Sequence, residues 1–104
     1  MKKSIIYWKG IRANIGLMFQ IPKQNTIYIL DLGTDRRSLI HTFFCFRPID
    51  IVLINSKLEM VGKYYKVYPF RAIFPKTSFR FIIEGVDLND IDLKFAKEYI
   101  LDVL

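Results

Sequence analysis

Two apolar runs separated by a proline constrain the fold of this chain more than any other feature. Residues 39–46 place apolar side chains on both alternating faces, and residues 49–54 resume as a second apolar run. Such runs are typical of strands that are covered on both sides. Pro48 cannot donate a backbone hydrogen bond and restricts Arg47 to an extended conformation, so a break is expected there. The pattern predicts two consecutive buried strands.

Further strand signals lie on both sides of this pair. Asn55, Ser56 and Lys57 form a predicted hairpin loop, after which the chain runs back as a strand. The remaining expectations are strands at 4–8, 26–30, 58–67 and 79–84, a turn or short helix at 11–19, and an exposed loop at 31–38.

The C-terminal tail changes to a helical pattern. Asn89 or Asp90 suits a helix N-cap, and Ile91, Phe95 and Tyr99 share one face at four-residue spacing. The chain of 104 residues is 52% hydrophobic, which is the size and apolar content of one domain spanning 1–104. We predict a mainly β fold, a compact, partly closed β-barrel or sandwich-like single domain with a short C-terminal helix.

Cysteine content and hydropathy define the expected compartment. Cys45 is the only cysteine, so no internal disulfide can form, which fits a reducing environment. The apolar run after Ser4 stops at Lys9, which is too short for a signal peptide. No run approaches the roughly 18 apolar residues of a membrane span. We expect a soluble cytoplasmic protein, monomeric or a small homo-oligomer, with no membrane partner.

Charge is distributed unevenly along the chain. Residues 1–83 carry 14 Lys and Arg against 4 Asp and Glu, whereas residues 84–104 carry 2 against 6. These balances of +10 and −4 give the net charge of +6. A basic body attracts polyanions. The alternative is that the acidic tail docks on the basic body and cancels much of this field.

Three segments resemble the family known as domain of unknown function 192. They are Gly16-Leu17-Met18-Phe19, the central stretch from His41 to Val52, and the stretch from Tyr68-Pro69-Phe70-Arg71 to Phe81-Ile82-Ile83-Glu84-Gly85. The central segment is the specific one, because it leads through aromatic residues into a Pro-hydrophobic-Asp element. The resemblance implies a compact, partly closed β fold with little helix, and it implies no activity.

The sequence departs from that family's pattern in three places. Cys45 stands where the family usually has methionine, and Phe46-Arg47 reverses the common order of the two residues. The family's last strand with its Gly-Asp pair is replaced by the helix-like tail. Any C-terminal feature of the family is therefore not carried over to this chain.

His41 and Cys45 invite comparison with a cysteine nucleophile and its base. On a strand, residues four apart lie roughly 13 Å from each other, whereas a nucleophile and its base need about 3 Å. We therefore interpret both as structural residues, and one histidine with one cysteine is too few for a zinc site. Residues 87–98 weakly imitate a calcium loop, but Asp92 stands where that loop requires glycine. Helix capping explains the same residues, so no metal site is predicted.

Asp50 is the first candidate binding residue. It follows Pro48 and begins an apolar strand, where a bare buried carboxylate is costly. The structural alternative is that backbone N–H groups or an arginine hold Asp50 in the turn. The functional alternative is that Arg47, Asp50 and Arg71 frame a polar site.

A second candidate is the interleaving of aromatic and cationic residues from 62 to 71. On a regular strand, Tyr64, Lys66 and Tyr68 share one face, which is suited to stacking bases while lysines contact phosphates. Tyrosines and lysine stems are also ordinary cover for a half-exposed sheet. No RNA-binding signature supports the first interpretation over the second.

The leading functional hypothesis is a non-catalytic binding or interaction module with an unknown ligand. Its candidate binding residues are Arg47, Asp50, Tyr64, Lys66, Tyr68 and Arg71; no catalytic residue, metal or cofactor is assigned. One alternative is a small enzyme that uses Asp50 or Glu84 with an arginine for acid–base work. The other is nucleic-acid binding by the basic, aromatic sheet face.

Overall fold

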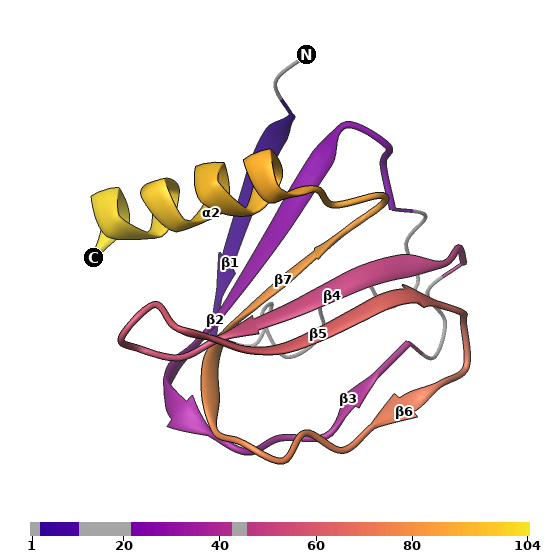
Figure 1. Cartoon of the computed structure of the whole chain (residues 1–104), viewed down its shortest axis with the longest axis horizontal. Helices are drawn as coiled ribbons and strands as arrows, with labels where there is room; N and C mark the ends of the chain where they lie inside the picture. Colours follow the sequence, from indigo (N-terminus) through magenta and orange to yellow (C-terminus); the bar gives the residue numbers. More distant parts are fainter. Residues whose placement is uncertain (1–2, 11–21, 43–45) are drawn as a thin grey trace.

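The computed structural model describes residues 3–10, 22–42 and 46–104. Their elements are β1 (Ser4–Lys9), β2 (Thr26–Arg36), β3 (Ile40–His41), β4 (Ile49–Ile54), β5 (Met60–Val67), β6 (Ala72–Ile73), β7 (Phe79–Gly85) and α2 (Asp90–Val103) (Figure 1). The Gly-Leu-Met-Phe segment at 16–19 and the residues Phe43, Phe44 and Cys45 lie outside the described residues.

Five strands form one sheet in the order β1-β2-β7-β4-β5. β1 pairs with β2 in parallel, and the other neighbours pair antiparallel. β3 and β6 form a separate antiparallel ladder in which Ile40 faces Ile73 and His41 faces Ala72. Figure 1 shows this ladder below the main sheet, at the far end of the molecule from α2.

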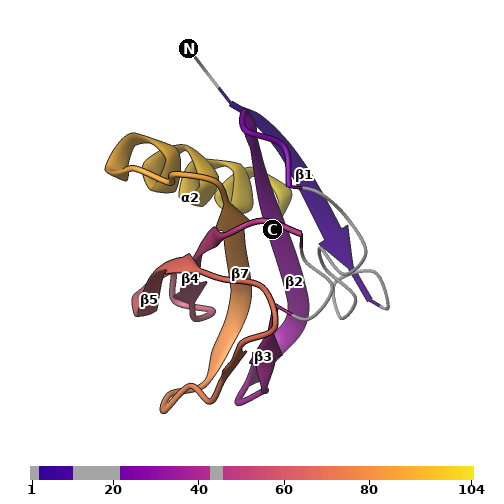
Figure 2. The same ribbon diagram turned by 90° about the vertical axis from the view of Figure 1, so that its right-hand side faces the viewer.

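The sheet buries a different apolar cluster on each face. The first cluster contains Tyr28, Leu30, Ile40, Ile49, Ile51, Leu53, Phe79, Ile82 and Val86. The second contains Ile27, Ile29, Val52, Ile54, Phe81 and Ile83, with Leu88, Leu93, Ala96 and Ile100 from the C-terminal segment. Because strand residues alternate between faces, β2, β4 and β7 contribute to both clusters. Figure 2 shows α2 lying over one side of the sheet, which is the side of the second cluster.

A capping box begins α2. Asn89 accepts a hydrogen bond from the Asp92 amide at 2.8 Å, and the Asp92 carboxylate accepts one from the Asn89 amide at 3.1 Å. Two otherwise unpaired N–H groups of the first turn are satisfied in this way. The predicted cap at Asn89 or Asp90 is confirmed, and capping accounts for the residues that imitate a calcium loop.

The mainly β fold with a C-terminal helix is confirmed. The described strands form an open sheet and a two-stranded ladder, so they do not close into a barrel. The hairpin at 55–57 and the strand at 49–54 are also confirmed. Across the described residues, no helix is long and apolar enough to cross a membrane.

The strand predicted at 39–46 is too long in our sequence interpretation. Its described part contains a strand only at β3, and Leu39 and Phe46 are 51% and 54% exposed. β3 is not a member of the main sheet, so only the side that carries Ile40 reaches the first cluster. In the described part of 39–46, the prediction of a strand is correct at β3, but the prediction that both faces of this strand are covered is wrong.

Two other expectations also need correction. β2 continues through Arg36 and includes most of the expected loop at 31–38, because Asp31 and Arg36 both pair with β7. On α2, Ile91 is 78% exposed although Phe95 and Tyr99 of its predicted face pack partly buried, and the buried helix positions are Asp92, Leu93, Ala96 and Ile100. The cap sets the rotation of the helix, since Asp92 must turn back toward Asn89.

Candidate binding surface

Asp50 is a buried structural link. Its Oδ1 accepts a hydrogen bond from the Lys66 amide and its Oδ2 accepts one from the Leu88 amide, both at 2.8 Å. The residue is 5% exposed. The carboxylate therefore joins β4 to β5 and to the turn before α2, which matches the structural alternative for Asp50. A ligand role for Asp50 stays a prediction.

Arg47 points toward the segment that precedes β2. Its Nη1 lies 3.4 Å from the Pro22 carbonyl oxygen, and its Nη2 lies 3.4 Å from Oε1 of Gln24. Both oxygens of Asp50 accept backbone amides, and the polar site expected of Arg47, Asp50 and Arg71 stays a prediction.

A bulge in β5 separates the residues that were expected to share one face. Ile51 lies opposite Tyr64, whereas Ile49 lies opposite Val67, so β5 contains an extra residue there. Lys66 has a φ of 50° and is exposed, while Tyr64 packs partly buried against the first cluster. The regular alternation on which the face of Tyr64, Lys66 and Tyr68 depended is therefore interrupted.

The turn from Tyr68 to Arg71 is anchored on Thr42. The Thr42 hydroxyl donates to the Tyr68 carbonyl at 2.7 Å and accepts from the Arg71 amide at 2.9 Å. The Thr42 backbone donates to the Arg71 carbonyl and accepts from the Phe70 amide. Thr42 is 2% exposed, whereas Tyr68 and Phe70 are 58% and 61% exposed. Two aromatic side chains are thus presented on a backbone that is held in place.

The outward face of the β3–β6 ladder continues from this turn. Ile40 and Ile73 pack on the first cluster, and alternation along each strand turns their neighbours Leu39 and Phe74 to the other face of the ladder. Leu39 and Phe74, which continue the register beyond this pair, are 51% and 76% exposed.

An open hollow of about 190 Å³ lies at this end of the ladder. It is lined by Leu39 and Phe74 together with Arg37, Ser38 and Pro75. The Arg37 Nε donates to the Pro75 carbonyl at 3.2 Å, which fixes one cation at its edge. We call the hollow, Phe70 and Arg71 the ladder surface.

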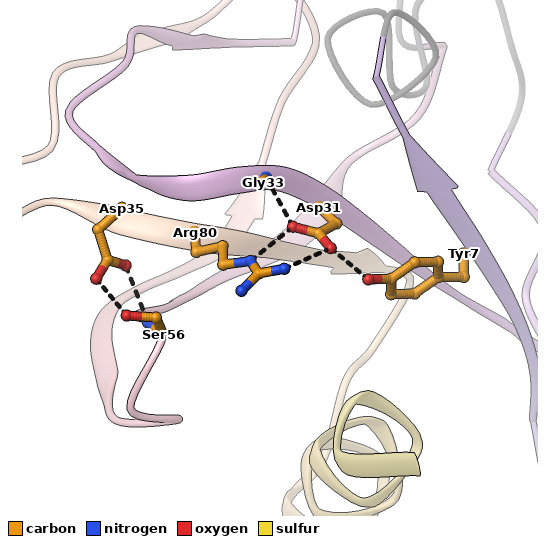
Figure 3. Close-up of polar contacts among 6 residues, drawn as sticks. All are labelled: Tyr7, Asp31, Gly33, Asp35, Ser56 and Arg80. Carbon is orange, nitrogen blue, oxygen red and sulfur yellow. Dashed lines mark hydrogen bonds and ion pairs between the residues drawn. The ribbon is translucent and has the colours of Figure 1, made fainter. Parts of the chain in front are cut away.

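A polar cluster that sequence reasoning missed joins three strands of the main sheet. Figure 3 shows Asp31 of β2 between Tyr7 of β1 and Arg80 of β7. Arg80 approaches both oxygens of Asp31, at 2.9 and 3.2 Å, and the Tyr7 hydroxyl donates to Oδ2 at 2.5 Å. The Gly33 amide donates to Oδ1 at 2.8 Å. Asp31 is 2% exposed, so its carboxylate is satisfied from all sides and acts as a link.

These contacts determine the protonation of the cluster. Burial alone raises the pKa of Asp31, but hydrogen bonds from Arg80, Tyr7 and Gly33 outweigh burial and leave that pKa below its ordinary value. The pKa of Tyr7 is raised by burial and by its hydrogen bond to Asp31. The hydrogen bond to Asp31 also raises the pKa of Arg80. The cluster therefore holds a fixed ion pair with a neutral tyrosine.

No pattern in the sequence signals this cluster, since Asp31 and Arg80 are 49 positions apart. Asp31 directly follows a buried strand segment, and Arg80 stands between Phe79 and Phe81. A charged residue beside large apolar residues shows only that the charge needs a partner, and it does not show which residue that partner is. Nearby, Asp35 accepts hydrogen bonds from the amide and hydroxyl of Ser56 and joins the end of β2 to the β4–β5 hairpin (Figure 3).

Glu84 differs from the other buried carboxylates. It lies on β7 between Tyr28 and Ile51 of the neighbouring strands and is 6% exposed. Burial raises the pKa of Glu84 from 4.5 to about 7. No ion pair joins Glu84 to an arginine in the part of the chain that the structure describes. Within the same ranges, no group of three or more His, Cys, Asp or Glu side chains is arranged to hold a metal ion.

Comparison with known proteins shows the family. A UPF0127 protein of Pyrococcus abyssi is 31% identical over 88 residues, which cover 77% of this chain and 74% of that protein. This chain belongs to the UPF0127 family. The UPF0127 proteins of Pyrococcus horikoshii and Pyrococcus furiosus are 36% and 33% identical over 75 residues, or 72% of this chain. The match spans 64% of the length of each of these two relatives.

Membership of an uncharacterised family is thus confirmed. No family model matches the chain, so the specific label of domain of unknown function 192 stays a prediction. Two solved structures share the fold. A protein of unknown function from Novosphingobium aromaticivorans has a TM-score of 0.71 at 12% identity, covering 86% of this chain and 67% of that chain. A protein from Sinorhizobium meliloti, for which a transcription-regulator role has been suggested, has a TM-score of 0.69 at 16% identity, with coverages of 89% and 73%.

Proposed function

We propose that this UPF0127 protein is a non-catalytic binding module that holds an anionic ligand on the ladder surface. The observation that carries the proposal is the pair Leu39 and Phe74, which flank a hollow with Arg37 fixed at its edge. Large exposed apolar side chains that gather beside polar groups mark interaction sites more often than single exposed residues do.

The charge around this surface favours an anion. Residues 60–83 contain Lys63, Lys66, Arg71, Lys76 and Arg80 and no acidic residue. Arg80 is engaged by Asp31, but Lys66, Arg71 and Lys76 are exposed. A patch of one charge sign raises the local concentration of ligands of the opposite sign.

Carboxylates contribute little to this surface. Asp31 and Asp50 are buried and hydrogen-bonded to named partners within the sheet. The acidic residues of α2 lie over the opposite side of the sheet (Figure 2). Acid–base catalysis by Glu84 with an arginine has weaker support, because the described residues supply no arginine contact to Glu84.

Titration with an anionic probe tests the proposal. We expect inorganic tripolyphosphate to shift the backbone amide resonances of Ser38, Arg71 and Phe74 in the isotope-labelled full chain at low salt. Arg71→Glu reverses an exposed charge on the ladder surface and should weaken binding roughly tenfold, which corresponds to about 1.4 kcal/mol.

The matched control is Lys94→Glu, which makes the same charge change at an exposed position of α2. It should change the affinity less than about twofold, the residual effect being that of net charge. Equal weakening by both variants, or no shift of the three amides, would contradict a ligand site on the ladder surface.

A further inference from the structure

We propose that the anionic ligand is a single-stranded nucleic acid, one base of which stacks on Phe74 while Arg37 and Arg71 contact its phosphates. This inference rests on the proposed function, and it names the class of ligand for the same surface.

The hollow supplies the first part of the argument. Phe74 is 76% exposed, and its neighbours in the hollow are an aliphatic side chain, a proline, a hydroxyl and a guanidinium. An aromatic face stacks on any base, and the Ser38 hydroxyl is able to donate to or accept from a base edge. A purely anionic ligand gives no reason for a large aromatic side chain to be exposed at the centre of the site.

The distribution of cations supplies the second part. Arg37 lines the hollow, and along the opposite strand Arg71 precedes Phe74 by three residues and Lys76 follows it by two. The extended backbone from Arg71 to Phe74 spans roughly 10 Å. Cations on both sides of an aromatic platform suit a ligand whose negative charges repeat along a chain and alternate with planar groups.

The anchored turn supplies the third part. Tyr68 and Phe70 are exposed next to Arg71, and Thr42 holds their backbone by hydrogen bonds to Tyr68, Phe70 and Arg71. A second aromatic position at a fixed distance from Phe74 allows a strand to be contacted at more than one base. A binding surface that is ordered before the ligand arrives loses less entropy on binding.

Two probes of equal charge separate the nucleic-acid inference from the proposed function. One is a fluorescently labelled 12-nucleotide oligothymidylate, and the other is an abasic 12-mer with the same sugar-phosphate backbone. Fluorescence anisotropy with the full chain at low salt should show at least about tenfold tighter binding of the oligothymidylate, as one stacked base provides.

Substitutions separate the contribution of base stacking to the affinity from the contribution of phosphate contacts. Phe74→Ala should weaken binding of the oligothymidylate about tenfold, toward the affinity of the abasic strand, and leave the latter unchanged, whereas Phe74→Tyr should keep the preference. Arg71→Gln should weaken both probes and reduce the slope of log affinity against log salt by about 0.7. Leu101→Ala, which truncates an exposed apolar residue of α2, is the matched control and should alter neither probe.

The outcomes are distinguishable. Equal affinity for the two strands, with Arg71→Gln weakening both, would overturn the nucleic-acid inference and leave the anionic site standing. Failure of both strands to bind at low salt would overturn the nucleic-acid inference, and absence of tripolyphosphate binding as well would overturn the anionic site. Thermal denaturation of each variant shows whether it is folded, which is expected because Phe74 and Arg71 are exposed.

Discussion

At the scale of single residues, the buried carboxylates of this protein have different partners and therefore different chemistry. Asp31 has an arginine, a tyrosine and a backbone amide, and Asp50 has two backbone amides. Glu84 is equally buried, but burial dominates its behaviour and raises its pKa to about 7. For Asp31 and Glu84, which are both buried, the hydrogen-bond partners explain why the pKa of Asp31 is lowered while that of Glu84 is raised.

Glu84 gives a pH dependence of known sign. Between pH 4.5 and about 7 the folded state retains a proton that the unfolded state has released, so the stability contribution is complete below 4.5 and is lost as pH rises through about 7. The whole difference corresponds to roughly 3 kcal/mol. Glu84→Gln should remove this slope in chemical denaturation at pH 5, 6, 7 and 8. A variant with the same slope as the natural chain would assign the dependence to another group.

We expect substitution of Asp31 to lower the free energy of unfolding more than substitution of its partner Tyr7. Asp31→Asn leaves the Arg80 guanidinium without its counter-charge and should cost about 3 kcal/mol at pH 7, as the loss of one partner of a buried pair does. Tyr7→Phe removes one hydrogen bond to a carboxylate and should cost about 1–2 kcal/mol. Urea denaturation measures both changes, and a larger loss for Tyr7→Phe would contradict the ranking.

At the scale of elements, one side chain holds the bulge of β5. The Lys66 amide, at a residue with a φ of 50°, donates to Asp50 and not to the strand ladder. Asp50→Ala leaves the buried amides of Lys66 and Leu88 unpaired and should cost about 1–3 kcal/mol for each of them. Hydrogen exchange should accelerate at Lys66 and Leu88 in this variant, and unchanged exchange at Leu88 would contradict the link to the turn before α2.

The elements also show which parts of the fold were predictable. β4 and the hairpin after it followed from apolar alternation and a polar loop, because both signals are local. The bulge was not predictable, since it depends on Asp50 reaching an amide 16 residues away. The length and burial of the strand at β3 were overestimated, because apolar alternation does not reveal which strands will be its neighbours.

At the scale of the whole molecule, the acidic tail docks without covering the ladder surface. Lys3 forms an ion pair with Asp92 at 2.9 Å and donates to the carbonyls of Val86 and Asp87. α2 packs on the second cluster, whereas β3 and β6 lie at the other end of the molecule (Figure 1). The acidic tail therefore docks on one side of the basic body and leaves the ladder surface on the other side open to an anionic ligand.

The sequence by itself determined the mainly β class, the hairpin, the helix cap and the uneven charge, because each depends on residues close together in the chain. Only the tertiary structure decided which carboxylates are paired, that β3 leaves the main sheet, and that Leu39 and Phe74 meet around a hollow. These features join residues tens of positions apart. The stretch from His41 to Ile54, the strongest local signal, thus divides between a buried strand of the main sheet and the edge of an exposed ladder.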